Sequence, residues 1–316
     1  MKPIQGLHHI TAAASDPQRN LDFYETILGQ RLVKTTVNFD DPGTYHLYYG
    51  DLVGTPGTIM TFFPWPNMRR GRRGIGEAAA VGYAIPDGSI VFWQDRLIQM
   101  DVEFSTEDNR FGDAAILLQD PDGMPIELIE SSDPTTIDHW GQGPIPAQHA
   151  LRGFHSVTLW LDTLDKTADL LKDGLGYTFV NHDGERHRYK AASNDRALYV
   201  DLLKKPGMNR GAFGAGSIHH IAFRTVDDEE QQEYLDLLRS AGQQVTPVKD
   251  RQYFHSIYFR EPGGVLFEVA TDAPGFAYDE PVEHLGSSLK LPSWLEGKRQ
   301  QIEDVLPPLH RNHVTG

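Results

Sequence analysis

The sequence repeats itself, and the repeats limit the folds that are open to this chain. Residues 7–33, LHHITAAASDPQRNLDFYETILGQRLV, resemble residues 154–180, FHSVTLWLDTLDKTADLLKDGLGYTFV. In both segments a strand-like apolar run precedes an amphipathic helix, and the helix ends at a Leu-Gly pair before a second strand. Glycine just past the last apolar residue is a common helix stop because it tolerates positive φ. Each half of the chain is therefore expected to begin with the same strand–helix–strand unit.

A second sequence repeat aligns Gly264 with Gly123 and relates the remaining parts of the two halves of the chain. Residues 119–130, QDPDGMPIELIE, match residues 260–271, REPGGVLFEVAT. Turn residues between two β-type runs predict a hairpin in each segment. The repeats together predict four modules, each with one strand, one helix and then three strands. The modules cover residues 5–65, 75–131, 150–204 and 215–271.

These modules predict an α+β fold. No module can bury its sheet face alone, so we expect four βαβββ modules to pair into two open sheets that enclose cavities. The expected domains are an N-terminal pair of modules in residues 1–133 and a C-terminal pair in residues 150–271. Residues 134–149 are rich in Pro and Gly and are interpreted as a linker. The extension 272–316 is expected to form one helix, starting at Ser293 with a Ser-x-x-Glu capping box, and to pack on the body or across a dimer.

Composition excludes several classes of protein. The formal net charge of −15 argues against a nucleic-acid or anionic-membrane surface. The basic run at residues 69–73 is interpreted as a solvated loop. Because cysteine is absent, disulfides, thiolate nucleophiles and cysteine-ligated metals are excluded, and any metal must be held by His, Asp or Glu. The sequence shows no apolar signal core or membrane-spanning run, so a cytoplasmic location is expected.

Two strand-like segments, GLHHIT and SIHHIA, each carry a pair of histidines. The internal repeats provide a test of their role, because architectural residues should recur in the sister module and residues of a single site need not. In the repeat alignment, His9 corresponds to Ser156 and His220 corresponds to Ala79, whereas Glu268 corresponds to another glutamate. One set therefore has the side chains to bind a metal and its counterpart does not. For one histidine alone, ordinary hydrogen bonding would be the simpler interpretation.

The set His9, His220 and Glu268 matches the two-histidine, one-carboxylate arrangement of non-haem Fe(II) oxygenases, which leaves about three coordination positions open. These ligands can meet only if the first module pairs with the fourth, which leaves the second to pair with the third. Strand alternation sends only one histidine of each pair into the cavity. His8 and His219 are therefore expected to be outer-shell neighbours of the ligands.

The motifs GLHHIT, IHH and PGGVLFE resemble the vicinal-oxygen-chelate superfamily, which is also called glyoxalase/bleomycin-resistance/extradiol dioxygenase. The four-module length, the TFFPWP stretch and the Pro-rich tail are most similar to its ring-cleaving hydroquinone dioxygenase branch. The resemblance implies an Fe(II) enzyme that opens an aromatic ring beside a hydroxyl group, using both atoms of O₂. Its partners would be a hydroquinone- or catechol-type diphenol and dioxygen, with homo-oligomers possible.

The resemblance also implies site residues. The metal ligands match His9, His220 and Glu268, and the outer shell matches Thr11 and the adjacent histidines. An Arg and a Tyr before the last strand match Arg251 and Tyr258.

The repeats qualify these roles. Arg251 falls on Arg110, so a structural role fits it as well as substrate binding does. Tyr258 falls on Leu117 and His255 on Ala114, so both differ as site residues should. Alternation puts Tyr258 and His255 on opposite faces, and we favour Tyr258 as the acid or base.

Two other functions are consistent with the sequence. With Mn, Zn or Ni in place of iron, the same fold could serve a glyoxalase-type isomerase or lyase. Without a metal, it could be a resistance protein that binds a quinone or a drug. We expect the aromatic side chains Phe62, Phe63 and Trp65 to contribute to an apolar pocket in any of these cases.

Overall fold

The computed structural model describes residues 2–132, 137–193 and 195–311, and it contains two eight-stranded sheets. The first sheet contains, in order, β14 (Lys249–Asp250), β15 (His255–Arg260), β16 (Leu266–Thr271), β13 (Ile218–Thr225), β1 (Leu7–Ala14), β4 (Ile59–Pro64), β3 (Asp41–Gly50) and β2 (Arg31–Asn38). The second contains β10 (Thr178–Asp183), β11 (Arg186–Lys190), β12 (Tyr199–Lys204), β9 (Phe154–Leu161), β5 (Glu77–Pro86), β8 (Pro125–Ser131), β7 (Asp113–Gln119) and β6 (Phe104–Arg110). The predicted α+β fold of four βαβββ modules in two sheets is confirmed.

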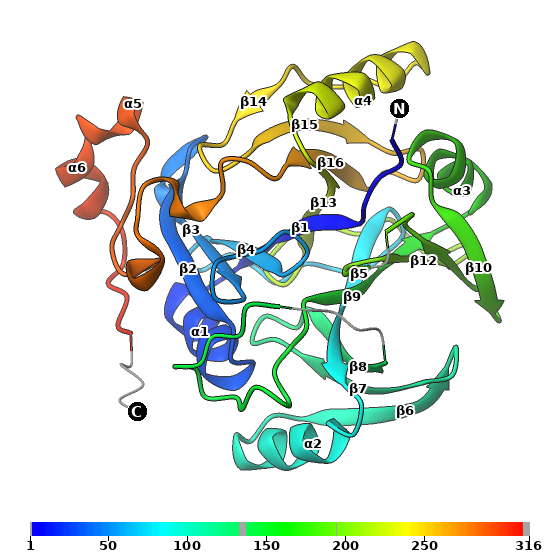
Figure 1. The fold of residues 1–316 in the computed structure, drawn as a ribbon, viewed down its shortest axis with the longest axis horizontal. Coiled ribbons are helices and arrows are strands. Elements are labelled where there is room, and N and C mark those ends of the chain that lie inside the picture. Colours follow the sequence, from blue (N-terminus) through cyan, green and yellow to red (C-terminus); the bar gives the residue numbers. More distant parts are fainter. Residues whose placement is uncertain (1, 133–136, 194, 312–316) are drawn as a thin grey trace.

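The sheet order places the strands of the first module beside those of the fourth, and the strands of the second beside those of the third. In the first sheet the two modules meet at β1 and β13, which pair antiparallel. In the second sheet they meet at β5 and β9, which also pair antiparallel. Figure 1 shows the first sheet at the upper left and the second at the lower right, with α4 over the first and α2 under the second. Each sheet therefore combines strands from both halves of the sequence.

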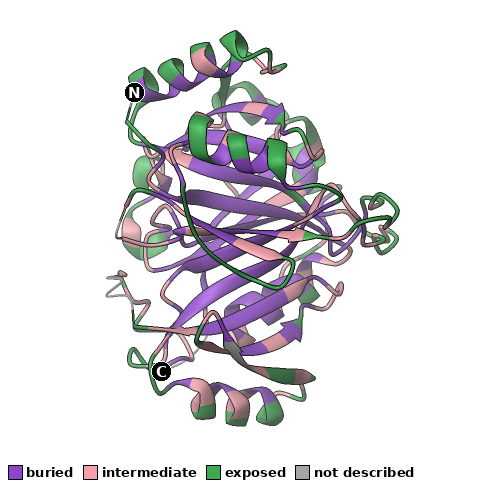
Figure 2. Cartoon of the chain, turned by 90° about the vertical axis from the view of Figure 1, so that its right-hand side faces the viewer, coloured by how far each residue is buried: buried purple, intermediate pink, exposed green. Residues whose placement is uncertain are grey.

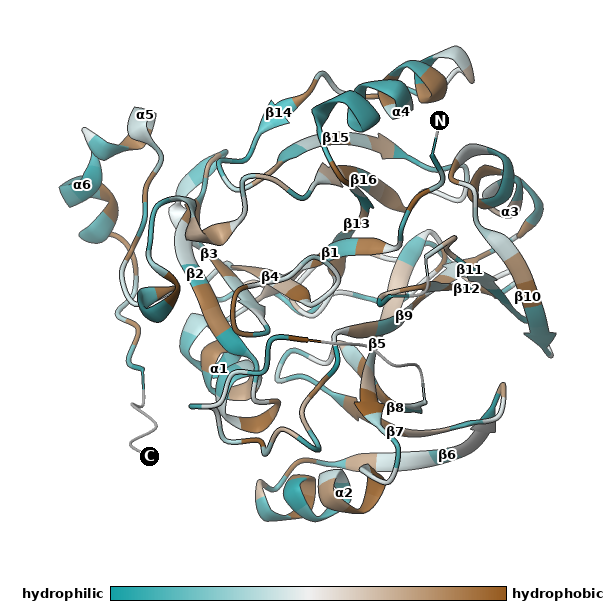
Figure 3. Cartoon of the chain, in the orientation of Figure 1, coloured by the Kyte–Doolittle hydropathy of each residue, from teal (hydrophilic) through white to brown (hydrophobic). Residues whose placement is uncertain are grey.

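One helix follows the first strand of each module and covers the outer face of its sheet. The first is α1 (Pro17–Leu21), which continues as a π-helical turn, and the Asp16 side chain caps it by accepting from two backbone N–H groups. The others are α2 (Ile90–Gln99), α3 (Asp165–Asp169), which also continues as a π-helical turn, and α4 (Asp228–Ser240). Their polar faces point to solvent, while the strands between them are largely buried (Figures 2 and 3). None of the helices in the described residues is long and apolar enough to span a membrane.

The extension beyond the fourth module packs on the first sheet. Phe276 and Leu285 join a buried cluster with Tyr48, Tyr253 and Phe254, next to the cavity of that sheet. Two short helices, α5 (Ser293–Glu296) and α6 (Arg299–Glu303), lie beside β2 and β3 (Figure 1).

The prediction of a single helix with a Ser293 capping box is wrong. Pro292 occupies the N-cap, and no side-chain cap hydrogen bond forms there. The helix ends at Glu296 with Gly297 at its C-cap, and the Glu296 carboxylate pairs with Arg299 instead of the helix start. Proline fixes the backbone angle at the N-cap, and glycine weakens the following turn, so the segment divides into two helices.

The basic run at residues 69–73 is also more than a solvated loop. The segment pairs with the loop before β13 through isolated β-bridges, such as the bridge between Arg70 and Ala215. The partly buried Arg73 guanidinium donates to the carbonyl oxygens of Gly123 and Gly216. The run therefore helps to hold the two halves of the chain together.

The second sheet carries buried ion pairs, and one of them includes Glu127, the counterpart of Glu268. Arg110 donates to Glu127, the counterpart of Glu268, at 2.5 Å, and both side chains are buried. Arg188 and Arg186 both pair with the buried Asp201. A guanidinium group thus balances the charge of Glu127 directly, whereas the carboxylate of Glu268 in the first sheet faces His9 and His220.

We expect the Arg110→Met variant to be less stable by about 3 kcal/mol, because it leaves the Glu127 charge buried without its partner. Urea unfolding monitored by circular dichroism measures this loss. The double variant Arg110→Met/Glu127→Met is expected to regain most of it, since no charge then remains buried. Equal stability of the wild type and the Arg110→Met variant would contradict this account of the second sheet.

Candidate metal centre

Three strands of the first sheet bring His9, His220 and Glu268 together. In the strand register, His9 of β1 and Glu268 of β16 both pair with Ala222 of β13, so their side chains emerge on the same face. Glu268 Oε2 lies 3.3 Å from His9 Nε2 and 2.9 Å from His220 Nε2, and the two Nε2 atoms are 3.3 Å apart. All three residues are buried.

This triangle fits a divalent cation. Donors bonded at about 2.1 Å and at right angles around one ion lie about 3.0 Å from each other. Although Glu268 Oε2 is close to both imidazoles, it has no hydrogen-bond partner among the described residues. A buried carboxylate oxygen without a hydrogen-bond partner lowers the stability of the fold. A cation bound between this oxygen and the two ring nitrogens would remove that cost. Neutral imidazole and carboxylate are the donors that such an ion would use.

The second oxygen of Glu268 is held separately. Ser256 on β15 is wholly buried, and its hydroxyl donates to Glu268 Oε1. The carboxylate therefore keeps Oε2 directed toward the two histidines. The sequence interpretation missed Ser256, although the repeats contain a signal for it, because Ser256 falls on Ala115 of the second module.

Each of the two candidate ligand histidines contacts the histidine before it. His9 Nδ1 lies 2.9 Å from His8 Nδ1, and His220 Nδ1 lies 2.8 Å from His219 Nδ1. If Nε2 of the ligand binds a metal, its Nδ1–H must donate, and the outer histidine must accept. Metal binding at Nε2 would thus fix the tautomers of His9 and His220, and the paired histidines supply the acceptors that this requires.

Strand alternation alone would send the two members of each pair to opposite faces, yet His8 and His219 lie beside His9 and His220, as the sequence led us to expect. The register between β1 and β13 shifts at His8 and again at His219, which lie at β-bulges. A bulge places two consecutive residues opposite one residue of the partner strand and re-aims their side chains. The bulges therefore let the outer histidine reach the inner one.

The protonation states suit metal binding. Burial, together with the neighbouring His9, lowers the pKa of His8, and burial lowers the pKa of His219 to about 3, so both can accept a hydrogen bond. Burial also lowers the pKa of His220. Burial by itself would raise the pKa of Glu268, but His9 and His220 outweigh it and hold that pKa well below its usual range. Neutral imidazoles beside an ionised carboxylate are the forms that ligate a cation.

Replacing His8 by leucine is expected to weaken metal binding by about 10-fold to 100-fold, because it removes the acceptor that orients His9. Competition with a fluorescent chelator measures the affinity. The matched control is His155→Leu, which changes the corresponding histidine of the second sheet and should leave the affinity unchanged. Equal losses in the two variants would show that His8 acts only through stability.

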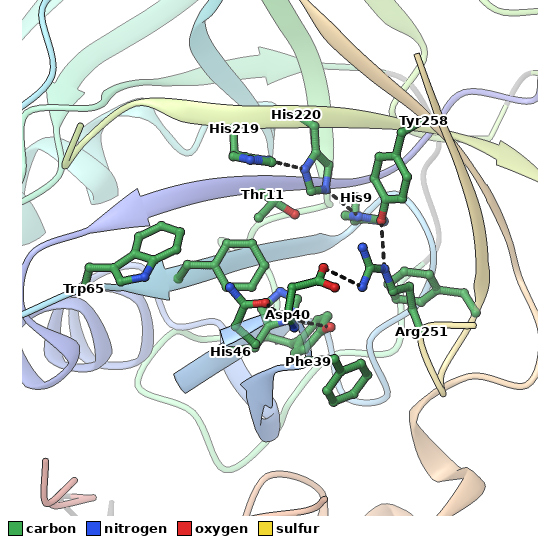
Figure 4. A pocket seen from close by; sticks show the side chains of 14 residues that line it. His9, Thr11, Phe39, Asp40, His46, Trp65, His219, His220, Arg251 and Tyr258 are labelled. Atoms are coloured by element: carbon green, nitrogen blue, oxygen red, sulfur yellow. Dashed lines mark hydrogen bonds and ion pairs between the residues drawn. The ribbon is translucent and has the colours of Figure 1, made fainter. Parts of the chain in front are cut away.

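A pocket of about 230 Å³ opens beside the triad. It is lined by His9, Thr11, Asn38, Phe39, Asp40, His46, Tyr48, Phe63, Trp65, His219, His220, Arg251, Phe254 and Tyr258. Figure 4 shows Tyr258 and Arg251 on one side of the histidines and Trp65 on the other. Polar groups gather near the triad while aromatic rings form much of the wall, an arrangement typical of small-molecule sites.

Arg251 and Tyr258 form a connected pair in this pocket. Arg251 Nε donates to the Tyr258 hydroxyl at 3.2 Å, and its Nη1 lies 3.1 Å from Asp40 Oδ2 (Figure 4). Burial, with the nearby Glu268, raises the pKa of Tyr258, so its hydroxyl remains protonated. Arg251 donates to the oxygen of that hydroxyl, so it does not take up the hydroxyl hydrogen.

Two residues expected at the site lie elsewhere. His255 faces away from the pocket, and its Nδ1 lies 2.6 Å from Asp228 on α4. It is on the opposite face from Tyr258 because the two residues are three apart on one strand. Phe62 is buried in the core beside Tyr24, whereas its neighbours Phe63 and Trp65 line the pocket.

Comparison with known proteins places this fold and site in a family. Residues 6–128 and 146–269 match the model of the Glyoxalase/Bleomycin resistance protein/Dioxygenase superfamily. The chain is 46% identical to the candidate ring-cleaving dioxygenase MhqO of Bacillus subtilis, over 97% of each protein. It is 36% identical to the chlorohydroquinone/hydroquinone 1,2-dioxygenase of Sphingobium indicum, over 95% of each.

Two solved structures have the same fold as this chain. The crystal structure of a candidate dioxygenase from Bacillus subtilis superposes with a TM-score of 0.94 at 45% identity, covering 98% of this chain and 99% of that one. Glyoxalase I from Zea mays shares the fold, with a TM-score of 0.63 at 15% identity, and the match covers 84% of this chain and 92% of that one. The chain therefore belongs to the glyoxalase/bleomycin resistance protein/dioxygenase superfamily.

Proposed function

We propose that the chain is a non-haem Fe(II) dioxygenase that cleaves the ring of hydroquinone- or catechol-type aromatics. The observation that carries this proposal is the triad itself. Two imidazole nitrogens and one carboxylate oxygen lie within 3.3 Å of one another beside an open, aromatic-walled pocket. A structural zinc site would instead be closed by four ligands. The names of the relatives that align over nearly the whole chain support the same reaction class.

His9, His220 and Glu268 would hold the ion. When bound, Fe(II) would supply the Lewis acidity and redox chemistry that the reaction of a phenol with dioxygen requires. Cleavage inserts both oxygen atoms of O₂ and breaks one ring C–C bond, so no external reductant is consumed. Three protein ligands leave room for reactants on the side of the pocket.

The other residues of the pocket would orient the ring and handle protons. Tyr258 can donate its hydroxyl hydrogen to an oxygen of the substrate, and Arg251 holds that hydroxyl in place. Phe63, Trp65 and Phe254 provide flat apolar surfaces for the ring and reduce the access of water. The protein thus contributes binding, orientation and a placed proton donor.

O₂ uptake by the anaerobically Fe(II)-loaded protein tests this function. Methylhydroquinone, chlorohydroquinone and catechol would be compared, with the protein loaded with Mn(II), Zn(II) or Ni(II) in parallel. We expect one O₂ to be consumed for each diphenol and both atoms of ¹⁸O₂ to appear in the ring-opened product. Absence of uptake with every diphenol would reject the dioxygenase and leave the isomerase and the binding protein as alternatives.

A further inference from the structure

A chain of hydrogen bonds in the first sheet ends at Thr11 beside the triad. The hydroxyl of Tyr48 lies 2.8 Å from His46 Nδ1, and His46 Nε2 lies 2.8 Å from Thr61 Oγ1. Thr61 Oγ1 in turn donates to Thr11 Oγ1 at 2.9 Å. These four residues, from β1, β3 and β4, are here called the relay.

The relay is held rigidly. Thr11 and Thr61 are fully buried, and Tyr48 is almost so. The His46 ring lies between Tyr48 and Phe63, with ring centroids 4.0 and 4.2 Å away. Because the ring cannot turn freely, its two nitrogens keep their partners.

The chemistry of the four groups gives the relay a direction. Burial lowers the pKa of His46 and raises that of Tyr48, so the imidazole is neutral with one N–H and the phenol keeps its proton. A phenol is a strong donor, so Tyr48 O–H donates to Nδ1 and the proton of His46 is on Nε2. Nε2–H then donates to Thr61, and Thr61 donates to Thr11. No acceptor for the Thr11 hydroxyl hydrogen exists among the described hydrogen bonds, and Thr11 lines the pocket.

The sister sheet shows that the fold does not require this relay. Thr61 pairs with Thr11 across strands, as Asp201 pairs with Thr158 in the second sheet. By the same register, Arg188 replaces Tyr48 and Arg186 replaces His46. There the threonine accepts from an arginine, Arg186 donating at 2.7 Å. The neutral relay is therefore confined to the sheet that carries the triad.

We propose that His46 is a positioning residue that, through Thr61, turns the Thr11 hydroxyl toward the pocket as a hydrogen-bond donor to an oxygen of the diphenol. This inference rests on the proposed function, since the diphenol is the ligand named there. It adds His46, Tyr48 and Thr61 to the residues that recognise the substrate. Thr11 touches the ligand, and the other three act through it.

A double-mutant cycle between His46→Leu and Thr11→Val tests the proposal. Binding of methylhydroquinone to the Fe(II)-loaded protein would be measured anaerobically by calorimetry, and kcat/KM would be measured by O₂ uptake. Each single variant is expected to lower affinity and kcat/KM by about 10-fold to 100-fold, the usual effect of losing a hydrogen bond to a charged group. The double variant should be within about twofold of Thr11→Val alone, because His46 acts only through Thr11.

Two further variants separate positioning from folding. His46→Gln is expected to recover part of the loss, since its amide can still donate to Thr61, and Tyr48→Phe should lower affinity in the same direction while keeping the ring. Thr158→Val, the matched change in the second sheet, should leave affinity and kcat/KM unchanged. Bound iron and the thermal midpoint are expected to stay at wild-type values in His46→Gln and Tyr48→Phe.

Additive losses in the cycle, or equal affinity of the wild type and His46→Leu, would overturn the relay while leaving the dioxygenase proposal intact. If the wild type consumes no O₂ with any diphenol, the proposed reaction fails, and the anaerobic affinities still decide whether the relay orients Thr11. The two failures are thus distinguishable.

Discussion

Replacing His220 by alanine is expected to remove both the bound iron and the ring-cleaving activity. The variant leaves two protein donors, of which Glu268 has lost the group nearest to its Oε2 atom, 2.9 Å away in the wild type. A metal ion contributes several kcal/mol of stabilisation to such reactions, so kcat/KM should fall by about 1000-fold or more. Metal content is measured by plasma emission spectrometry and activity by O₂ uptake.

The control for this variant is His255→Ala. His255 is on the first sheet too, but it faces α4 and Asp228 on the side away from the pocket. We expect it to keep wild-type iron content and activity. If His220→Ala retained its iron and its activity, the triad would not be the site of the metal.

Tyr258→Phe is expected to lower kcat by about 100-fold to 10000-fold, the usual contribution of a placed proton donor. Phenylalanine keeps the ring but removes the hydroxyl that Arg251 orients. Iron content should not change, because Tyr258 is not a ligand. Steady-state O₂ uptake, together with iron analysis of the same samples, measures both quantities.

Tyr177→Phe is the matched control, because the Tyr177 hydroxyl is buried without a hydrogen-bond partner among the described residues. Removing that hydroxyl should leave kcat unchanged. Equal kcat in Tyr258→Phe and the wild type would assign the proton donor to another group of the pocket.

The arrangement of strands and helices could be predicted from the sequence because each module repeats the same pattern of strand, helix and hairpin. The repeats also distinguish His9 and His220 from their counterparts Ser156 and Ala79, and this difference does not depend on knowing the fold. The structure brings these two histidines to Glu268, although 211 residues separate them in the chain.

The parts that the sequence did not predict depend on local backbone geometry. Strand alternation is a rule for regular strands, and the bulges at His8 and His219 break it where the outer histidines are needed. The hydrogen bonds of Ser256 and His46 depend on strand register, which periodicity does not fix. His255 differed from its counterpart, as a site residue should, but it faces α4 because of its position on the strand.

The most direct test of the triad is crystallography of the Fe(II)-loaded protein with data collected at the iron absorption edge. One anomalous peak is expected per chain, at about 2.1 Å from His9 Nε2, His220 Nε2 and Glu268 Oε2. No peak is expected beside Glu127, where Arg110 occupies the corresponding place. An iron peak bound by other side chains, or the absence of any peak between these three, would contradict the account.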